Sequence, residues 1–186
     1  MASRHSTPQS YGLLIENGKY RGIDTDVDEC MLRMGPGDVV VTGANIIDSH
    51  GGAAALAGSP GGFRWGRAAA AMVSEGADVI VPSGLEKLIP GSVIDSMKCA
   101  RRKNIDSQDG MACGLFPVIG SIITEVEAIQ TLADVDVCII GRGGIHGAEG
   151  GTLFQIHGEA EEVKRVEAIA AQCKNQKIGG DETSLL

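Results

Sequence analysis

The chain has few aromatic residues and no concentrated basic segment. Aromatic side chains make up 3% of its 186 residues, whereas glycine occurs 27 times, so we expect close backbone approaches and small core side chains. The formal net charge is −8, and the run Arg101-Arg102-Lys103 is short and isolated. Because binding to a phosphate backbone requires a basic face, the composition argues against a nucleic-acid partner.

Long apolar runs are also missing. No run is long enough to span a bilayer, and Met1 to Tyr11 lacks the apolar stretch of a signal peptide. We therefore expect a cytoplasmic protein without a membrane partner.

The sequence offers little evidence for a disulfide or a metal site. The five cysteines form no C-x-x-C pair, a pattern that favours free thiols. His146 and His157 flank a predicted hairpin with Glu149 between them, but their spacing fits no usual metal-ligand pattern. We expect no metal and no cofactor.

Length and patterning predict one larger and one smaller unit in an α/β protein. We place a parallel-sheet, Rossmann-like ligand-binding core at residues 1–114 and a small ferredoxin-like α+β unit at residues 115–186. Residues 1–10 are polar and read as a tail. The pair Asn17-Gly18 predicts a hairpin over residues 13–23, and a short helix is expected over residues 24–34.

The predicted core is a strand, loop, helix and strand. A buried strand begins at Asp38, a long loop covers residues 49–62, an alanine-rich helix covers residues 63–75, and a second buried strand covers residues 78–82. A further helix is expected over residues 91–103. In parallel sheets, ligands bind beyond the carboxyl ends of the strands, where both loops of this unit lie.

The first loop has the features of an anion site. Its glycines precede a helix, so backbone N–H groups and the helix dipole can meet negative charge, and cations in the first helical turn favour a bound anion. The alternative is that the glycines only allow tight turns and that the arginines are solvated or paired with carboxylates. The predicted ligand-binding residues are Gly43, Asn45, Gly51, Gly52, Gly58, Ser59, Gly61, Gly62, Arg64, Arg67 and Ser83.

The second loop contributes a possible acid–base pair. Glu86 and Lys87 follow the second strand, near the first loop, and are candidates for a general base and an electrostatic stabiliser. The alternative is a helix cap or a surface ion pair.

The last third of the chain changes its pattern. A strand is expected over residues 115–120, a helix over residues 124–133 with Thr124 and Glu127 as a capping box, a hairpin over residues 135–157 and a helix over residues 159–173. This β-α-β-β-α order, closed by a strand near Ile178, is the ferredoxin-like arrangement, which commonly serves as a lid or an oligomer interface. We expect a homo-oligomer.

Two segments resemble one superfamily. The strand ending in Gly43-Ala44-Asn45 resembles the one that carries an active-site carboxylate in methylthioribose-1-phosphate isomerase, and residues 84–90 are similar to a stretch of the lactate-utilisation proteins. The superfamily also includes ribose-5-phosphate isomerase, glucosamine-6-phosphate deaminase and the CoA-transferases. The resemblance covers residues 37–91 and implies a branch of its own within this group. Because Asn45 cannot take a proton, Asp48 would have to replace the isomerase carboxylate.

Three functions remain open at this point. The first is a phosphosugar isomerase-like enzyme acting by proton transfer, with Glu86, Lys87 and Asp48 as catalytic residues. The second is a transferase-like protein that binds a CoA thioester. The third is a sensor or assembly protein that has kept the fold without the chemistry. In each, the partner is a small phosphorylated or CoA-linked anion.

Overall fold

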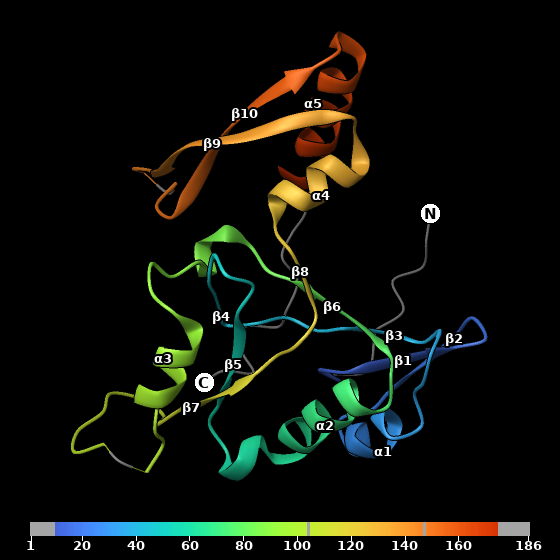
Figure 1. Ribbon diagram of the computed structural model, residues 1–186, viewed down its shortest axis with the longest axis vertical. Coiled ribbons are helices and arrows are strands. Elements are labelled where there is room, and N and C mark those ends of the chain that lie inside the picture. Colours follow the sequence, from blue (N-terminus) through green and yellow to red (C-terminus); the bar gives the residue numbers. More distant parts are fainter. Residues whose placement is uncertain (1–9, 104, 147, 175–186) are drawn as a thin grey trace. The chain divides into compact units, whose positions relative to one another are not determined.

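A computed structural model describes residues 10–103, 105–146 and 148–174 and divides into two compact units, with the division after Ile123 (Figure 1). The sequence analysis placed this boundary nine residues earlier, between residues 114 and 115. The expectations for residues 1–9 and for a strand near Ile178 lie outside the described residues.

The N-terminal hairpin and helix are confirmed. Strands β1 (Leu13–Glu16) and β2 (Lys19–Gly22) pair antiparallel. The turn residues Asn17 and Gly18 have φ values of 50° and 73°, the left-handed backbone that an Asn-Gly hairpin turn requires. Helix α1 (Val27–Met31) is shorter than expected and turns Val27, Cys30 and Met31 into the core.

A three-stranded parallel sheet forms the centre of the first unit. Strand β6 (Asp78–Pro82) lies between β3 (Val39–Val41) and β8 (Ser121–Ile123) and is parallel to both. Between β3 and β6, the chain first contributes strands to a second sheet and then forms helix α2 (Phe63–Ser74). Helix α2 lies beside α1 (Figure 1). The core gathers Val40, Val79 and Val81 from the sheet with Ala68, Ala71 and Met72 from α2. The mixed α/β class is therefore confirmed.

A second, antiparallel sheet corrects the sequence analysis. Strand β5 (Ala53–Ala57) lies between β4 (Ile46–Ile47) and β7 (Gly114–Pro117). The sequence analysis assigned residues 53–57 to the loop over residues 49–62, and alanine has low strand propensity. Burial of Ala53 and Ala54, together with pairing on both edges, outweighs that propensity. The strand expected over residues 115–120 is β7, and it pairs with β5 in the first unit.

Short helical elements follow the strands of the first unit. The 3-10 turns are η1 (Pro60–Gly62) and η2 (Leu85–Lys87), and helix α3 (Val93–Cys99) begins after Ser92, whose hydroxyl accepts the N–H of Ile94. The helix expected over residues 91–103 is thus confirmed with narrower bounds.

The second unit contains two helices and a hairpin. Helix α4 (Glu125–Leu132) begins with the predicted Thr124 and Glu127 capping box. Strands β9 (Val135–Gly143) and β10 (Gly151–Gly158) pair antiparallel, and helix α5 (Ala160–Lys174) follows. Within the described residues of both units, no helix combines the length and apolar character needed to cross a membrane.

Candidate functional site

Two backbone amides at the glycine-rich turn before α2 are hydrogen-bonded to nearby carbonyls. Gly61 and Gly62 have φ values of 61° and 69°, and the amide of Gly62 donates to the carbonyl of Ser59 at 3.0 Å. The amide of Phe63 donates to the carbonyl of Pro60. These contacts favour the tight-turn interpretation of the loop from Gly58 onward, because two of the amides expected to meet an anion already have partners.

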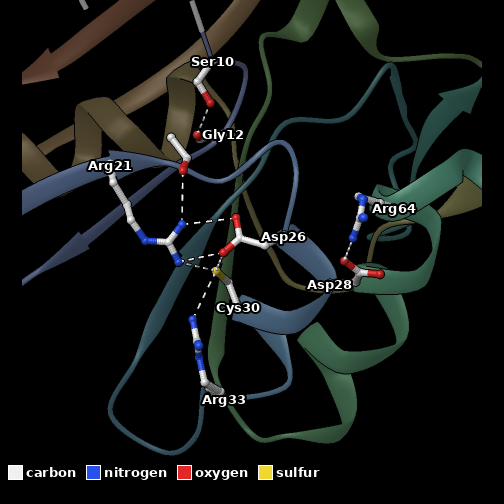
Figure 2. Close-up of polar contacts among 9 residues, drawn as sticks. Ser10, Gly12, Arg21, Asp26, Asp28, Cys30, Arg33 and Arg64 are labelled. Atoms are coloured by element: carbon white, nitrogen blue, oxygen red, sulfur yellow. Dashed lines mark hydrogen bonds and ion pairs between the residues drawn. The ribbon is translucent and has the colours of Figure 1, made fainter. Parts of the chain in front are cut away.

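The arginines of α2 face a carboxylate. Arg64 Nη1 lies 2.8 Å from Asp28 Oδ1, and Arg67 Nη1 lies 3.9 Å from Asp28 Oδ2 (Figure 2 shows Arg64 directed at Asp28). The hydrogen bond from Arg64 lowers the pKa of Asp28. This contact links α2 to α1. It agrees with the alternative considered above, in which the arginines are paired with carboxylates.

Asp48 organises the backbone around it. Its buried carboxylate accepts the amides of Val93 and Gly52 at 2.8 Å and of His50 at 2.9 Å. The bonds from Val93 and Gly52 lower its pKa. A carboxylate held by three amides joins the β4–β5 turn to the start of α3, so its local role is structural.

Asn45, Gly51 and Gly52 shape the same hairpin. Asn45 Oδ1 accepts the amide of Leu56 at 2.8 Å. Gly51 has a φ of 85°, and a Cβ at Gly52 would meet the carboxylate of Asp48 at under 3.0 Å. All three residues therefore have structural roles in the β4–β5 hairpin.

Three polar side chains of the sequence analysis, Ser83, Glu86 and Lys87, follow the carboxyl end of β6. Ser83 is 4% exposed, and its hydroxyl has no hydrogen-bond partner within the described part of the chain. Glu86 is exposed and its carboxylate lies against Gly84, while Lys87 is half-buried. In that same described part, neither Glu86 nor Lys87 forms an ion pair, so the surface ion pair considered above is not seen.

A large cleft lies elsewhere in the first unit, along the outer edge of β3. Its volume is about 980 Å³, and its walls are residues 11–16 of the hairpin, residues 38–43 on and around β3, side chains on and after α1, and Trp65. Of the predicted ligand-binding residues, Gly43 borders it. The sequence analysis missed this cleft; the signal was β3 itself, whose alternating exposure leaves Val39 52% and Val41 67% exposed.

Two arginines border the cleft, and they differ in whether they form an ion pair. Arg21 is paired with Asp26 at 2.8 Å. Arg33 is exposed and forms no ion pair with any residue that the structure describes; its Nη2 lies 3.5 Å from Cys30 Sγ. Asp38 and Glu16 also border the cleft, and Asp38 accepts the amide of Gly35. Arg33 is thus an exposed cation on the wall that forms no ion pair among the described residues, although its charge, after the hydrogen bond from Arg21, helps to lower the pKa of Asp26.

Comparison with known proteins identifies no relative: no family model, no curated protein and no solved structure matches the chain. Within the described residues, no group of three or more His, Cys, Asp or Glu side chains is placed to hold a metal ion.

Proposed function

We propose that the protein binds a small phosphorylated or CoA-linked molecule in the cleft along β3. The observation that carries this proposal is Arg33, an exposed guanidinium on the cleft wall that forms no ion pair with any described residue. A cleft of about 980 Å³ is in the upper part of the range for small-molecule sites, roughly 300–1,000 Å³. The ligand therefore has room for an anionic group together with a larger organic part.

The lining supports a ligand with both polar and apolar parts. Leu13, Val39, Val41 and Trp65 supply apolar surface, and Arg33 can form charge-assisted hydrogen bonds with phosphate oxygens. The cleft extends to Gly43, just beyond the carboxyl end of β3, the edge at which parallel α/β sheets bind their ligands. The binding position thus moves from the glycine-rich loop to the open side of β3.

The finer fold assignment is part of the same proposal. Two parallel strands joined through α2 support a Rossmann-like core of the CoA-transferase and phosphosugar-isomerase kind. The order α4, β9, β10 and α5 keeps the α-β-β-α part of the expected ferredoxin-like order, but its first strand, expected over residues 115–120, is β7 and pairs in the first unit. Exposed Ile140 and Leu153, at 53% and 60%, support burial of the β9–β10 hairpin in a homo-oligomer.

Titration with two probes tests the binding proposal. Coenzyme A and ribose 5-phosphate are added separately to the wild-type chain, and melting temperature and binding heat are measured. We expect one probe to bind, and Arg33→Met to weaken it about 10- to 100-fold, the value of a hydrogen bond to a charged group. Arg101→Met removes an exposed arginine outside the cleft and serves as the control. Absence of binding by both probes, or equal losses in the two variants, contradicts the proposal.

A second candidate is proton-transfer catalysis at the carboxyl end of β6. The observation that favours it is the buried hydroxyl of Ser83, which has no partner in the described chain, next to Glu86 and Lys87. Glu86 would act as the base and Lys87 would stabilise an enediolate. Glu86→Gln should reduce turnover of a bound sugar phosphate about 10²- to 10⁴-fold. Unchanged turnover in this variant excludes Glu86 as the base, and binding without turnover by the wild type supports a sensor.

A further inference from the structure

The cleft of the first unit is bordered by two strands that each leave one edge open. Strand β3 is the outermost strand of the parallel sheet, and β1 is paired with β2 alone. Residues 11–16 and 38–43 line the same cleft of about 980 Å³. Within the described residues, no backbone hydrogen bond joins β1 to β3. Both strands therefore face the cleft without a strand partner on that side.

Val39 and Val41 direct their backbone groups away from the sheet. The carbonyl of Asp38 accepts an amide of β6 at 2.9 Å, and the amide of Thr42 donates to a carbonyl of β6 at 3.0 Å. Because successive residues of a strand direct their N–H and C=O groups to opposite edges, those of Val39 and Val41 point to the outer edge of β3. In the described part of the chain, no other strand pairs with this edge. The two residues thus offer two donors and two acceptors to a molecule in the cleft.

Strand β1 presents a second row of backbone groups. The carbonyl of Gly12 accepts the amide of Ile23 at 3.0 Å, so Gly12 faces the partner side of the hairpin. The alternation continues along β1, and Leu13 and Ile15 direct their N–H and C=O groups away from β2. Both residues border the cleft, which therefore has strand-edge backbone groups on two of its walls.

These features distinguish between the two kinds of ligand proposed for the cleft. A sugar phosphate can contact Arg33, but it has no amide groups to pair with a strand edge, and it is small for this volume. CoA is far larger, and its phosphopantetheine arm is a narrow chain with two amides, apolar methylene and methyl groups, and a phosphate at one end. Such an arm can pair with an open strand as an extended peptide does, while its apolar groups contact the exposed side chains of Val39 and Val41.

We propose that the cleft binds the phosphopantetheine arm of CoA or of a CoA thioester, extended along the outer edge of β3. The amides of the arm exchange hydrogen bonds with the outward N–H and C=O groups of Val39 and Val41, and Arg33 contacts a phosphate. This inference rests on the binding proposal for the same cleft and adds the ligand class and the strand that recognises it. Backbone groups, and not particular side chains, select the arm.

Calorimetric titration of the wild-type chain with parts of the ligand tests this inference. With a reductant present, CoA should bind about tenfold more tightly than ADP, which has the pyrophosphate without the arm, because the arm adds hydrogen bonds between neutral groups. Pantetheine, which has the arm without phosphates, should compete with CoA. Equal or tighter binding of ADP, or no competition by pantetheine at millimolar concentration, overturns the inference. If ribose 5-phosphate binds and CoA does not, the binding proposal survives and this inference fails.

A proline at position 41 removes one outward amide. Proline is tolerated on an edge strand where its nitrogen faces away from the sheet, so Val41→Pro leaves the pairing with β6 in place. It should weaken CoA binding about 3- to 10-fold, the value of one hydrogen bond between neutral groups, and leave ADP binding unchanged. Val41→Thr keeps the amide and should retain the affinity that Val41→Pro loses. Circular dichroism of both variants verifies folding.

Two results with these variants contradict the inference. One is equal CoA affinity in Val41→Pro and the wild type, and the other is an equal loss of CoA and ADP binding in Val41→Pro. The pantetheine competition uses the wild-type chain, so it decides the inference even if Val41→Pro does not fold.

Discussion

Replacing Gly66 with alanine should destabilise the first unit, because this glycine allows the η1 turn to contact α2. A Cβ built on Gly66 would lie 2.8 Å from the carbonyl carbon of Gly61, and closer still to the oxygen of that carbonyl. Both obstructing atoms are backbone, so a side-chain rotation cannot relieve the clash. Alanine is nevertheless a better helix former than glycine, and the two effects oppose each other.

The relative sizes of the clash and of the gain in helix propensity decide whether Gly66→Ala destabilises the protein. Overpacking costs about 1–3 kcal/mol, and a clash with backbone atoms belongs at the upper end of that range. The gain in helix propensity is about 1 kcal/mol. We therefore expect Gly66→Ala to lower the free energy of unfolding by about 1–2 kcal/mol, the difference between these terms.

Trp65 provides the assay, since it is the chain's one tryptophan and lies beside Gly66 on α2. Urea unfolding followed by its fluorescence reports on the first unit. Gly91→Ala is the matched control, because a Cβ there meets nothing within 4 Å and needs no positive φ; it should be neutral or about 0.4–1 kcal/mol stabilising. Equal stability of Gly66→Ala and the wild type would refute the close approach of η1 to α2.

Two further predictions concern polar groups of the same unit. The amides of Val93 and Gly52 lower the pKa of Asp48, so its stabilising contribution is present above the ordinary carboxyl range and is lost as pH falls through the lowered pKa. Wild type should therefore lose more stability than Asp48→Asn in urea titrations as the pH falls from about 5 towards about 1, the range over which the contribution of such a carboxylate is lost, and parallel curves would contradict this role. Ser83→Ala should keep or raise stability, by up to about 1 kcal/mol, because the buried hydroxyl has no partner among the described residues; a loss of similar size in thermal unfolding would show that the hydroxyl is satisfied.

Local signals in the sequence were sufficient for several elements. Asn17-Gly18 predicts its hairpin because both residues tolerate a positive φ, and Thr124 with Glu127 predicts the start of α4 because the capping box is completed within four residues. The Val39–Val41 and Asp78–Pro82 strands were recognised from their β-branched residues, and they pair in parallel as expected.

Long-range contacts explain what the sequence could not show. Asp28 lies 36 positions before Arg64, so nothing local indicates that this carboxylate takes the arginine. Strand β5 depends on partners on both of its edges, one of them β7, which is distant in sequence. The cleft likewise forms only because the hairpin, α1 and β3 lie together, and no local sequence motif predicts that arrangement.

NMR chemical shifts of the backbone amides report directly where the ligand binds. The ¹⁵N-labelled chain is titrated with coenzyme A and, separately, with ribose 5-phosphate, and amide chemical shifts are followed. Binding along β3 predicts that the largest shifts occur at residues 13–15 and 39–43, which border the cleft. Shifts confined to the Gly58–Gly62 amides, with the cleft residues unmoved, would contradict it and place the anion at the start of α2.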